Sequence, residues 1–173
     1  MQNFTGVLAS TSIDNCEVNI PKPDAQHANN NSYIVDESVF LESENGSVFQ
    51  TSDVIVAMLG RPYWEDASGK RLLNTQEQFK SLANGWQKQG AESFKQLNGH
   101  FAIVLIDRKT RSCHLYSDRV GVFRLYWHQL ENNQGFGFGT SMAGIKTVCN
   151  LGNEISPDAL YAYMYFHMIP TPF

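Results

Sequence analysis

Three cysteines, three of the five histidines and one pair of aspartates are candidates for catalysis or metal binding in this sequence. A cysteine thiolate is both a nucleophile and a metal ligand. Cys16, Cys113 and Cys149 are an odd-numbered, widely spaced set without a CxxC pair. The cysteines therefore predict neither a disulfide framework nor a zinc site.

The histidines and aspartates have a structural interpretation as well. His100, His114 and His128 recur along predicted strands, but their spacing matches no common ligand pattern, so we predict no metal site. Asp107 and Asp118 could form an acid–base pair of carboxylates. Both fall at turn positions, where aspartate is a favoured residue, so we interpret them as turn residues.

Composition excludes several classes of protein. The chain has 173 residues, of which 42% are hydrophobic and 17% charged, which is typical of a globular domain with a sizeable core. The formal net charge is -4, and the first arginine is Arg61, so no basic patch indicates nucleic-acid binding. No apolar run approaches the length that crosses a membrane, and the N-terminus lacks a signal-peptide pattern. We expect a soluble, cytoplasmic protein with no membrane partner.

Apolar runs predict the strands, at residues 4–9, 54–58, 101–106, 113–116, 122–128 and 135–139. In the last of these runs, GFGFG, two phenylalanines fall on one side. Residues 33–41 and 47–50 flank Glu44-Asn45-Gly46, and an Asn-Gly pair between such runs predicts a hairpin. The polar stretch from Ser10 to Asn31 predicts a long loop.

Two longer helices are expected. Thr75 and Gln78 form a capping-box pattern, after which Phe79, Leu82 and Trp86 share a helical face and Gly90 suits the position past the helix end. Residues 91–96 predict one further helical turn.

The second helix begins near the C-terminus, where Ser156 is a predicted N-cap before Pro157. Many strands, two helices and no regular β-α-β alternation indicate an α+β fold with mostly antiparallel sheets.

Several ordered motifs between residues 97 and 146 resemble one known family. That family carries L-x-G-x-F-A-φ-x-φ-x-D, a turn, R-D-x-x-G-x-x-P-L-Y, a strand, and S-E-φ-K-A-φ, where φ is apolar. The matching residues here are Leu97, Gly99, Phe101, Ala102, Asp107, Asp118, Gly121, Leu125, Tyr126 and the stretch 140–146. Ser117 and Arg124 depart from the pattern. The sequence thus resembles the class II glutamine amidotransferase domain of the asparagine synthetase and β-lactam synthetase family.

The resemblance implies a fold and a reaction. The fold is that of the N-terminal-nucleophile hydrolases, a four-layer αββα sandwich of two antiparallel sheets between helices. The reaction is glutamine hydrolysis by a cysteine directly after the initiator methionine. The start of this chain, MQNFTGVL, is similar to the family's MCGIxGxx, but Gln2 occupies the nucleophile position. Because an amide side chain cannot form a thiolate, the usual reaction should be absent.

Three further groups of the family's site are also missing. The resemblance places Leu59 where an Asn-Gly pair supplies the oxyanion hole, so Leu59 replaces the donor asparagine and Gly60 remains. No arginine precedes Arg61 to hold the substrate carboxylate. The start of the first long helix, at Thr75, offers no aspartate for the substrate amine. We therefore expect a vestigial pocket near Gln2, Leu59, Gly60, Arg61 and Thr75, with no catalytic residue.

The resulting hypothesis is an inactive glutaminase-like domain at residues 1–155 of an ATP-dependent, amide-forming ligase. Residues 156–173 would be a helix and linker leading toward a C-terminal synthetase domain, the expected partner. ATP and Mg are implied for that domain only, since the family's SGGxDS loop is not in this sequence. The helix should expose aromatic residues, which tends to favour self-association, for example as a homodimer.

Two alternatives remain open. One is a stand-alone binding protein in which the vestigial pocket holds another small ligand. The other is a hydrolase whose N-terminus is processed to expose Thr5 as the nucleophile.

Overall fold

The computed structural model describes residues 3–10, 31–35, 39–44, 48–64 and 75–170. Their strands form two antiparallel sheets. The first has the order β2-β3-β1-β9-β8, and the second has the order β4-β5-β6-β7. In chain order the strands are β1 (Phe4–Ala9), β2 (Asn31–Val35), β3 (Val39–Glu44), β4 (Val48–Gln50), β5 (Val54–Gly60), β6 (Phe101–Asp107), β7 (Ser112–Ser117), β8 (Tyr126–Gln129) and β9 (Gly135–Gly139).

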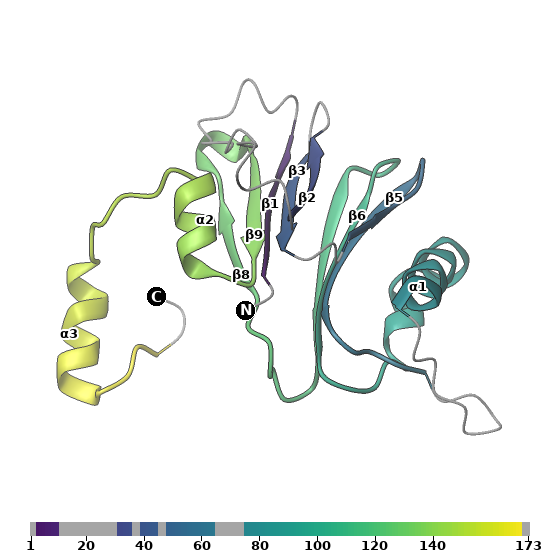
Figure 1. Cartoon of the computed structure of the whole chain (residues 1–173). Helices are drawn as coiled ribbons and strands as arrows, with labels where there is room; N and C mark the ends of the chain where they lie inside the picture. The colour runs from purple at the N-terminus through teal and green to yellow at the C-terminus, as the bar shows by residue number, and fades with distance from the viewer. Residues whose placement is uncertain (1–2, 11–30, 36–38, 45–47, 65–74, 171–173) are drawn as a thin grey trace.

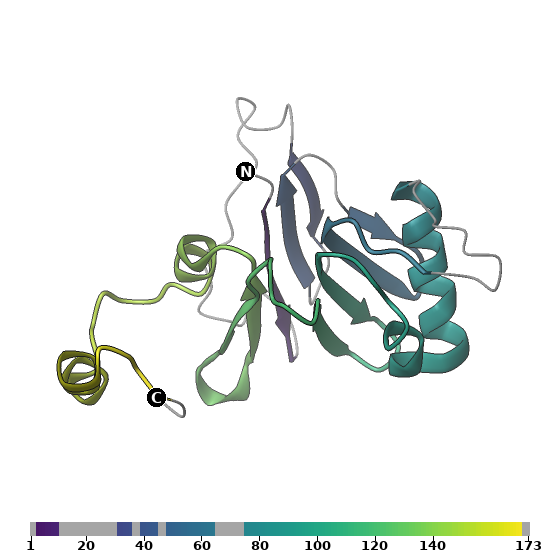
Figure 2. The same ribbon diagram turned by 90° about the horizontal axis from the view of Figure 1, so that it is seen from below.

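One helix covers the outer face of each sheet (Figures 1 and 2). Helix α1 (Thr75–Gln89) lies on the second sheet and runs into the 3-10 turn η2 (Gly90–Phe94). Helix α2 (Met142–Val148) lies on the first sheet, after the 3-10 turn η3 (Glu131–Asn133). Helix α3 (Pro157–Phe166) stands apart from both sheets. The layers α1, sheet, sheet, α2 confirm the predicted αββα sandwich.

Alternation along the strands builds the core between these layers. In β5, Ile55, Ala57 and Leu59 join the cluster between the sheets, while Val54, Val56 and Met58 pack against Phe79 and Leu82 of α1. A strand that is covered on both faces needs apolar residues at every position, which explains the unbroken apolar runs of β5 and β6.

The two faces of strand β9 also differ, as the sequence GFGFG predicts. Phe136 and Phe138 face the inter-sheet cluster, which confirms that the two rings lie on one side. The glycines face α2. A Cβ on Gly137 would lie 2.1 Å from Sγ of Cys149, so only glycine lets α2 pack this closely.

The helix predictions hold at their ends. Helix α1 begins at Thr75, and Gly90 after it has φ +57°, in the left-handed region that favours glycine. The Ser156 hydroxyl accepts from the Ala159 N–H at 3.3 Å, as expected of the α3 N-cap. In the predicted capping box, however, the Gln78 amide donates to the Pro62 carbonyl at 2.7 Å, and this bond ties α1 to the chain after β5.

Three predictions about the strands and helices are wrong. Residues 33–41 are not one strand, and the predicted Glu44-Asn45-Gly46 hairpin does not form: β3 pairs with β1 and β2, whereas β4 pairs with β5 in the other sheet. The predicted strand 122–128 is limited to β8, which pairs with β9. Helix α2 was not predicted, although Ser141 caps it. The long loop predicted from Ser10 falls mostly on residues outside the described part.

Candidate active site at one end of the sandwich

The start of β1 and the end of β5 lie at the same end of the sandwich. Gly60 pairs with Phe101, whose carbonyl accepts from the Asp118 N–H at 3.0 Å. From Asp118 the chain crosses to the first sheet, where Tyr126 pairs with Gly139, which in turn pairs with Thr5. The pairing thus brings together, from segments far apart in sequence, the two strand ends at which the predicted site residues fall.

Thr140 fixes the first residues of β1. Its hydroxyl accepts from the Phe4 N–H at 3.1 Å, and its own N–H donates to the Phe4 carbonyl at 2.9 Å. The same hydroxyl donates to Oδ1 of Asn3 at 3.4 Å. Gln2, which precedes Asn3 and is predicted to occupy the nucleophile position, lies outside the described residues.

Leu59, the predicted replacement of the oxyanion donor, is part of the core. Its side chain is 8% exposed and belongs to the cluster between the sheets, against which Phe123 and Leu125 also pack. An isobutyl group has no hydrogen to donate to a developing oxyanion. At this position the strand end is therefore filled by apolar atoms.

Gly60 and Arg61 follow with different environments. Gly60 has φ +93°, and a Cβ there would lie 2.2 Å from the His100 carbonyl oxygen and 2.7 Å from the Phe123 ring. Glycine is therefore required at this position. The Arg61 N–H donates to the His100 carbonyl at 2.9 Å, and the Arg61 side chain is exposed. Thr75, the fifth predicted pocket residue, begins α1, but its side chain lies outside the described part.

Asp118 and Phe123 organise the crossing between the sheets. Oδ1 of Asp118 accepts from the N–H groups of Val120 at 2.9 Å and Gly121 at 2.8 Å, and Oδ2 accepts from Phe101 at 3.1 Å. Burial raises the pKa of Asp118, but these backbone donors outweigh burial and hold the pKa below its ordinary value. The interpretation of Asp118 as a turn residue is confirmed. The contact of Phe123 with Gly60 was not foreseen, because no local pattern marks it.

The other candidate nucleophiles lie elsewhere. Thr5 is buried within β1, and a Cβ on Gly144 of α2 would lie 2.4 Å from its hydroxyl oxygen, so Thr5 faces α2 and not Leu59. Burial raises the pKa of the Cys113 thiol to about 12 and that of Cys149 to about 11, so both stay protonated at neutral pH. Cys16 is not among the described residues.

His114 and Asp107 each contact the Trp86 side chain. The His114 ring lies 4.3 Å from the Trp86 ring and hydrogen-bonds through Nε2 to the Ser112 hydroxyl at 2.8 Å. Trp86 Nε1 donates to Asp107 at 2.9 Å. Within the described ranges, no group of three or more His, Cys, Asp or Glu side chains could hold a metal ion. Nor is any helix there long and apolar enough to cross a membrane.

Comparison with known proteins agrees with this fold and its motifs. Residues 50–173 match the family model of the glutamine amidotransferase domain. The chain belongs to this family. It is 32% identical over 92 residues to a putative asparagine synthetase [glutamine-hydrolyzing] 2 from Methanocaldococcus jannaschii. That alignment covers 51% of this amidotransferase domain and 17% of the archaeal protein, and it supports the resemblance to asparagine synthetases.

Proposed function

We propose that this amidotransferase domain does not hydrolyse glutamine and serves a structural or interface role in an asparagine-synthetase-like, ATP-dependent, amide-forming ligase. The observation that carries the proposal is the burial of Leu59 in the inter-sheet core at the end of β5. The family resemblance assigns this position to the donor that stabilises the oxyanion. A buried leucine both removes that donor and occupies its space.

The sequence at the other family positions supports the same conclusion. Gln2 supplies no thiolate, and without a thiolate there is no covalent intermediate. No arginine precedes Arg61 to pair with the α-carboxylate of glutamine. The loss of an oxyanion donor alone costs roughly 3 kcal/mol of transition-state stabilisation. The combined losses exceed what one substitution can restore.

A glutaminase assay tests this proposal directly. We expect no ammonia release from glutamine above the buffer blank, either from the unmodified domain or from Gln2→Cys. Mass spectrometry of Gln2→Cys should first confirm that the initiator methionine is removed, so that a missing free amine does not explain the result. The double variant Gln2→Cys with Leu59→Asn should also release no ammonia, because no arginine precedes Arg61 to hold the substrate carboxylate. Ammonia release by the unmodified domain would overturn the proposal.

Glutamine binding provides a second, separate measurement. An α-carboxylate or ammonium group without a partner in a closed site costs several kcal/mol, so we expect no saturable heat on titration with millimolar glutamine. Saturable binding would mean that the carboxylate clamp lies elsewhere in the chain. Binding of a different small ligand at Leu59 and Gly60 would instead favour the alternative of a stand-alone binding protein.

Helix α3 supports the interface part of the proposal. Its Ala162 is buried, while its large apolar side chains are exposed around the helix: Leu160 47%, Tyr161 66%, Tyr163 57%, Met164 72%, Tyr165 69% and Phe166 58%. The expectation of a partly exposed apolar helix is thereby confirmed. A helix that is apolar all round is normally buried within a larger body. We propose that a synthetase domain, which would carry the ATP and Mg site, covers α3, and the division at residue 155 stays a prediction.

Sedimentation velocity tests whether the domain self-associates through α3. We predict that Tyr161→Lys with Met164→Lys abolishes concentration-dependent association in sedimentation velocity, because two ammonium groups would have to be desolvated in the contact. Gln87→Lys with Gln96→Lys adds the same charge at exposed positions of α1 and the segment after η2, and should leave association unchanged. A domain that is monomeric at all concentrations would contradict self-association.

A further inference from the structure

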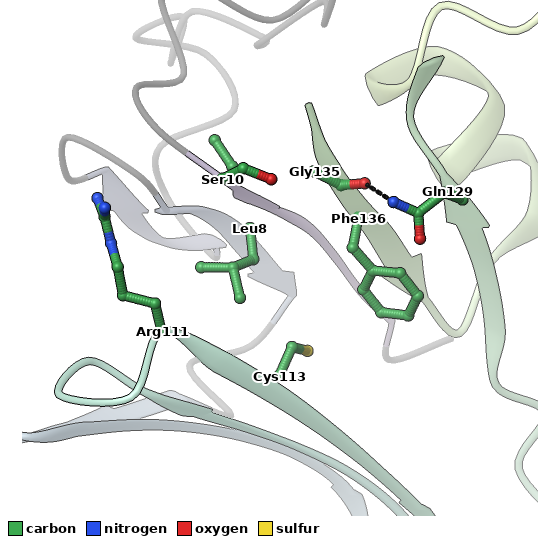
Figure 3. A pocket seen from close by; sticks show the side chains of 8 residues that line it. Leu8, Ser10, Arg111, Cys113, Gln129, Gly135 and Phe136 are labelled. Atoms are coloured by element: carbon green, nitrogen blue, oxygen red, sulfur yellow. Dashed lines mark hydrogen bonds between the residues drawn. The ribbon is translucent and has the colours of Figure 1, made fainter. Parts of the chain in front are cut away.

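A cavity lies between the sheets at the end opposite to Leu59 and Gly60. It has a volume of about 420 Å³ and is lined by Leu8, Ala9, Ser10, Arg111, Cys113, Gln129, Gly135 and Phe136 (Figure 3). Cys113, the second residue of β7, pairs with Ile106 near the far end of β6, and Ser10 follows the last residue of β1. None of the positions that the family resemblance assigns to the glutaminase site lines this cavity.

The inner walls of the cavity are apolar. The side chains of Leu8, Cys113 and Phe136 all belong to or pack against the inter-sheet cluster, so the cavity continues the core outward. The Cys113 thiol is protonated, since burial raises its pKa to about 12, and therefore adds no charge to this wall. A volume near the lower end of the range of ligand pockets suits a molecule of one or two rings.

One wall extends to the surface as an aromatic platform. The Phe136 ring stacks on the Trp127 ring, with centroids 5.6 Å apart and an interplanar angle of 26°. Trp127 is 64% exposed on the edge strand β8. A flat ring that enters the cavity meets Phe136 directly and remains close to Trp127.

The two uncharged polar side chains of the lining offer acceptors. The Ser10 hydroxyl donates its proton to the Asn133 carbonyl at 2.7 Å. The Gln129 amide donates through Nε2 to the Gly135 carbonyl at 3.1 Å, and this bond directs its oxygen toward the Phe136 side (Figure 3). The Arg111 guanidinium, the charged group of the lining, points away from Gln129 and Phe136 (Figure 3). At the Gln129 end, where the hydroxyl proton and one amide N–H are already engaged, a ligand therefore gains most by bringing its own donor.

We propose that this cavity binds a small, planar, uncharged molecule that carries an N–H or O–H donor, of the size of a phenol or an indole. The ring lies between Leu8, Cys113 and Phe136. Its donor bonds to the Gln129 amide oxygen. The site is independent of the glutaminase position, so it stands or falls separately from the proposed function.

Phenol is the probe and toluene is its comparator without a donor. Binding is followed by tryptophan emission, excited beyond the absorption of phenol, and by ligand-observed NMR. We expect saturable phenol binding at roughly millimolar concentration. Toluene should bind about fivefold more weakly, which is the change expected for one neutral hydrogen bond. The Trp127→Phe variant should lose the emission change but keep the NMR signal.

Three variants separate this site from adventitious binding. Gln129→Leu should weaken phenol about fivefold and remove its preference over toluene. Cys113→Phe fills the cavity and should abolish binding of both molecules. Gln96→Leu makes the same polar-to-apolar change at an exposed position far from the cavity and should have no effect.

Two results would exclude the proposed binding site. Absence of saturable phenol binding, or binding that Gln129→Leu leaves unchanged, excludes the site. Gln129 is exposed on an edge strand, so this variant decides the question even if Cys113→Phe fails to fold.

Discussion

Leu59 contributes both to the packing of the core and to the proposed inactivity of the domain. An asparagine there would have to place an amide among Phe123, Leu125 and the apolar strand residues of the inter-sheet cluster. We predict that Leu59→Asn lowers the free energy of unfolding by roughly 2–4 kcal/mol, through lost packing and an unsatisfied amide. Leu59→Met, which conserves volume and apolarity, should cost less than about 1.5 kcal/mol. Urea unfolding measures both, and an equally stable Leu59→Asn variant would show that the strand end is loosely packed.

Asp118 gives a second residue-level prediction, which depends on pH. Since its folded pKa lies below the ordinary value, its carboxylate stabilises the fold above the unfolded pKa of about 3.9 and loses this effect as pH falls through the folded pKa. Asp118→Asn puts an N–H donor among the backbone donors and should cost about 1–2 kcal/mol at pH 7. This difference should shrink below about pH 4.

The control for Asp118 is another aspartate without such contacts. Asp158→Asn, on exposed helix α3, removes the same charge and should leave the unfolding free energy of the sandwich nearly unchanged at each pH. An Asp118→Asn deficit that persists undiminished in acid would mean that the carboxylate acts by shape alone.

At the level of elements, the packing of α2 on β9 depends on the glycines of GFGFG. A methyl group at position 137 would overlap Sγ of Cys149, the buried residue at the C-terminal end of α2. We predict that Gly137→Ala costs about 1–3 kcal/mol by overpacking. Cys149→Ala should relieve part of that cost in the double variant. A double-mutant cycle measures the coupling, and additive effects would show that α2 shifts freely on the sheet.

For the whole molecule, stability should be distributed unevenly between the sandwich and α3. Strands β5 and β6 are interior strands of their sheet and are buried on both faces, whereas the large apolar side chains of α3 are exposed. We predict that amide hydrogen exchange is slowest in β5 and β6 and that α3 exchanges orders of magnitude faster. Protection of α3 equal to that of β6 in the isolated domain would mean that α3 is already covered, for instance by a second copy.

The sequence by itself determined the features that depend on near neighbours. The apolar runs of β1, β5 and β6, the Ser156 cap of α3, and the turn at Asp118 all depend on residues a few positions apart. The order of the motifs was enough to indicate the αββα sandwich. The prediction that Gln2 stands at the family's nucleophile position likewise needs no coordinates.

Only the tertiary structure decided which strands pair and what the strand ends enclose. An Asn-Gly pair at residues 45–46 signals that the chain turns, but it carries no information on the partner of either flanking strand, and β3 and β4 joined different sheets. The same holds for Phe123 against Gly60 and for the cavity at Gln129 and Cys113. Both features bring together segments that are far apart in the sequence. These segments meet because the two sheets bury their apolar faces against each other, and no local sequence pattern records that long-range packing.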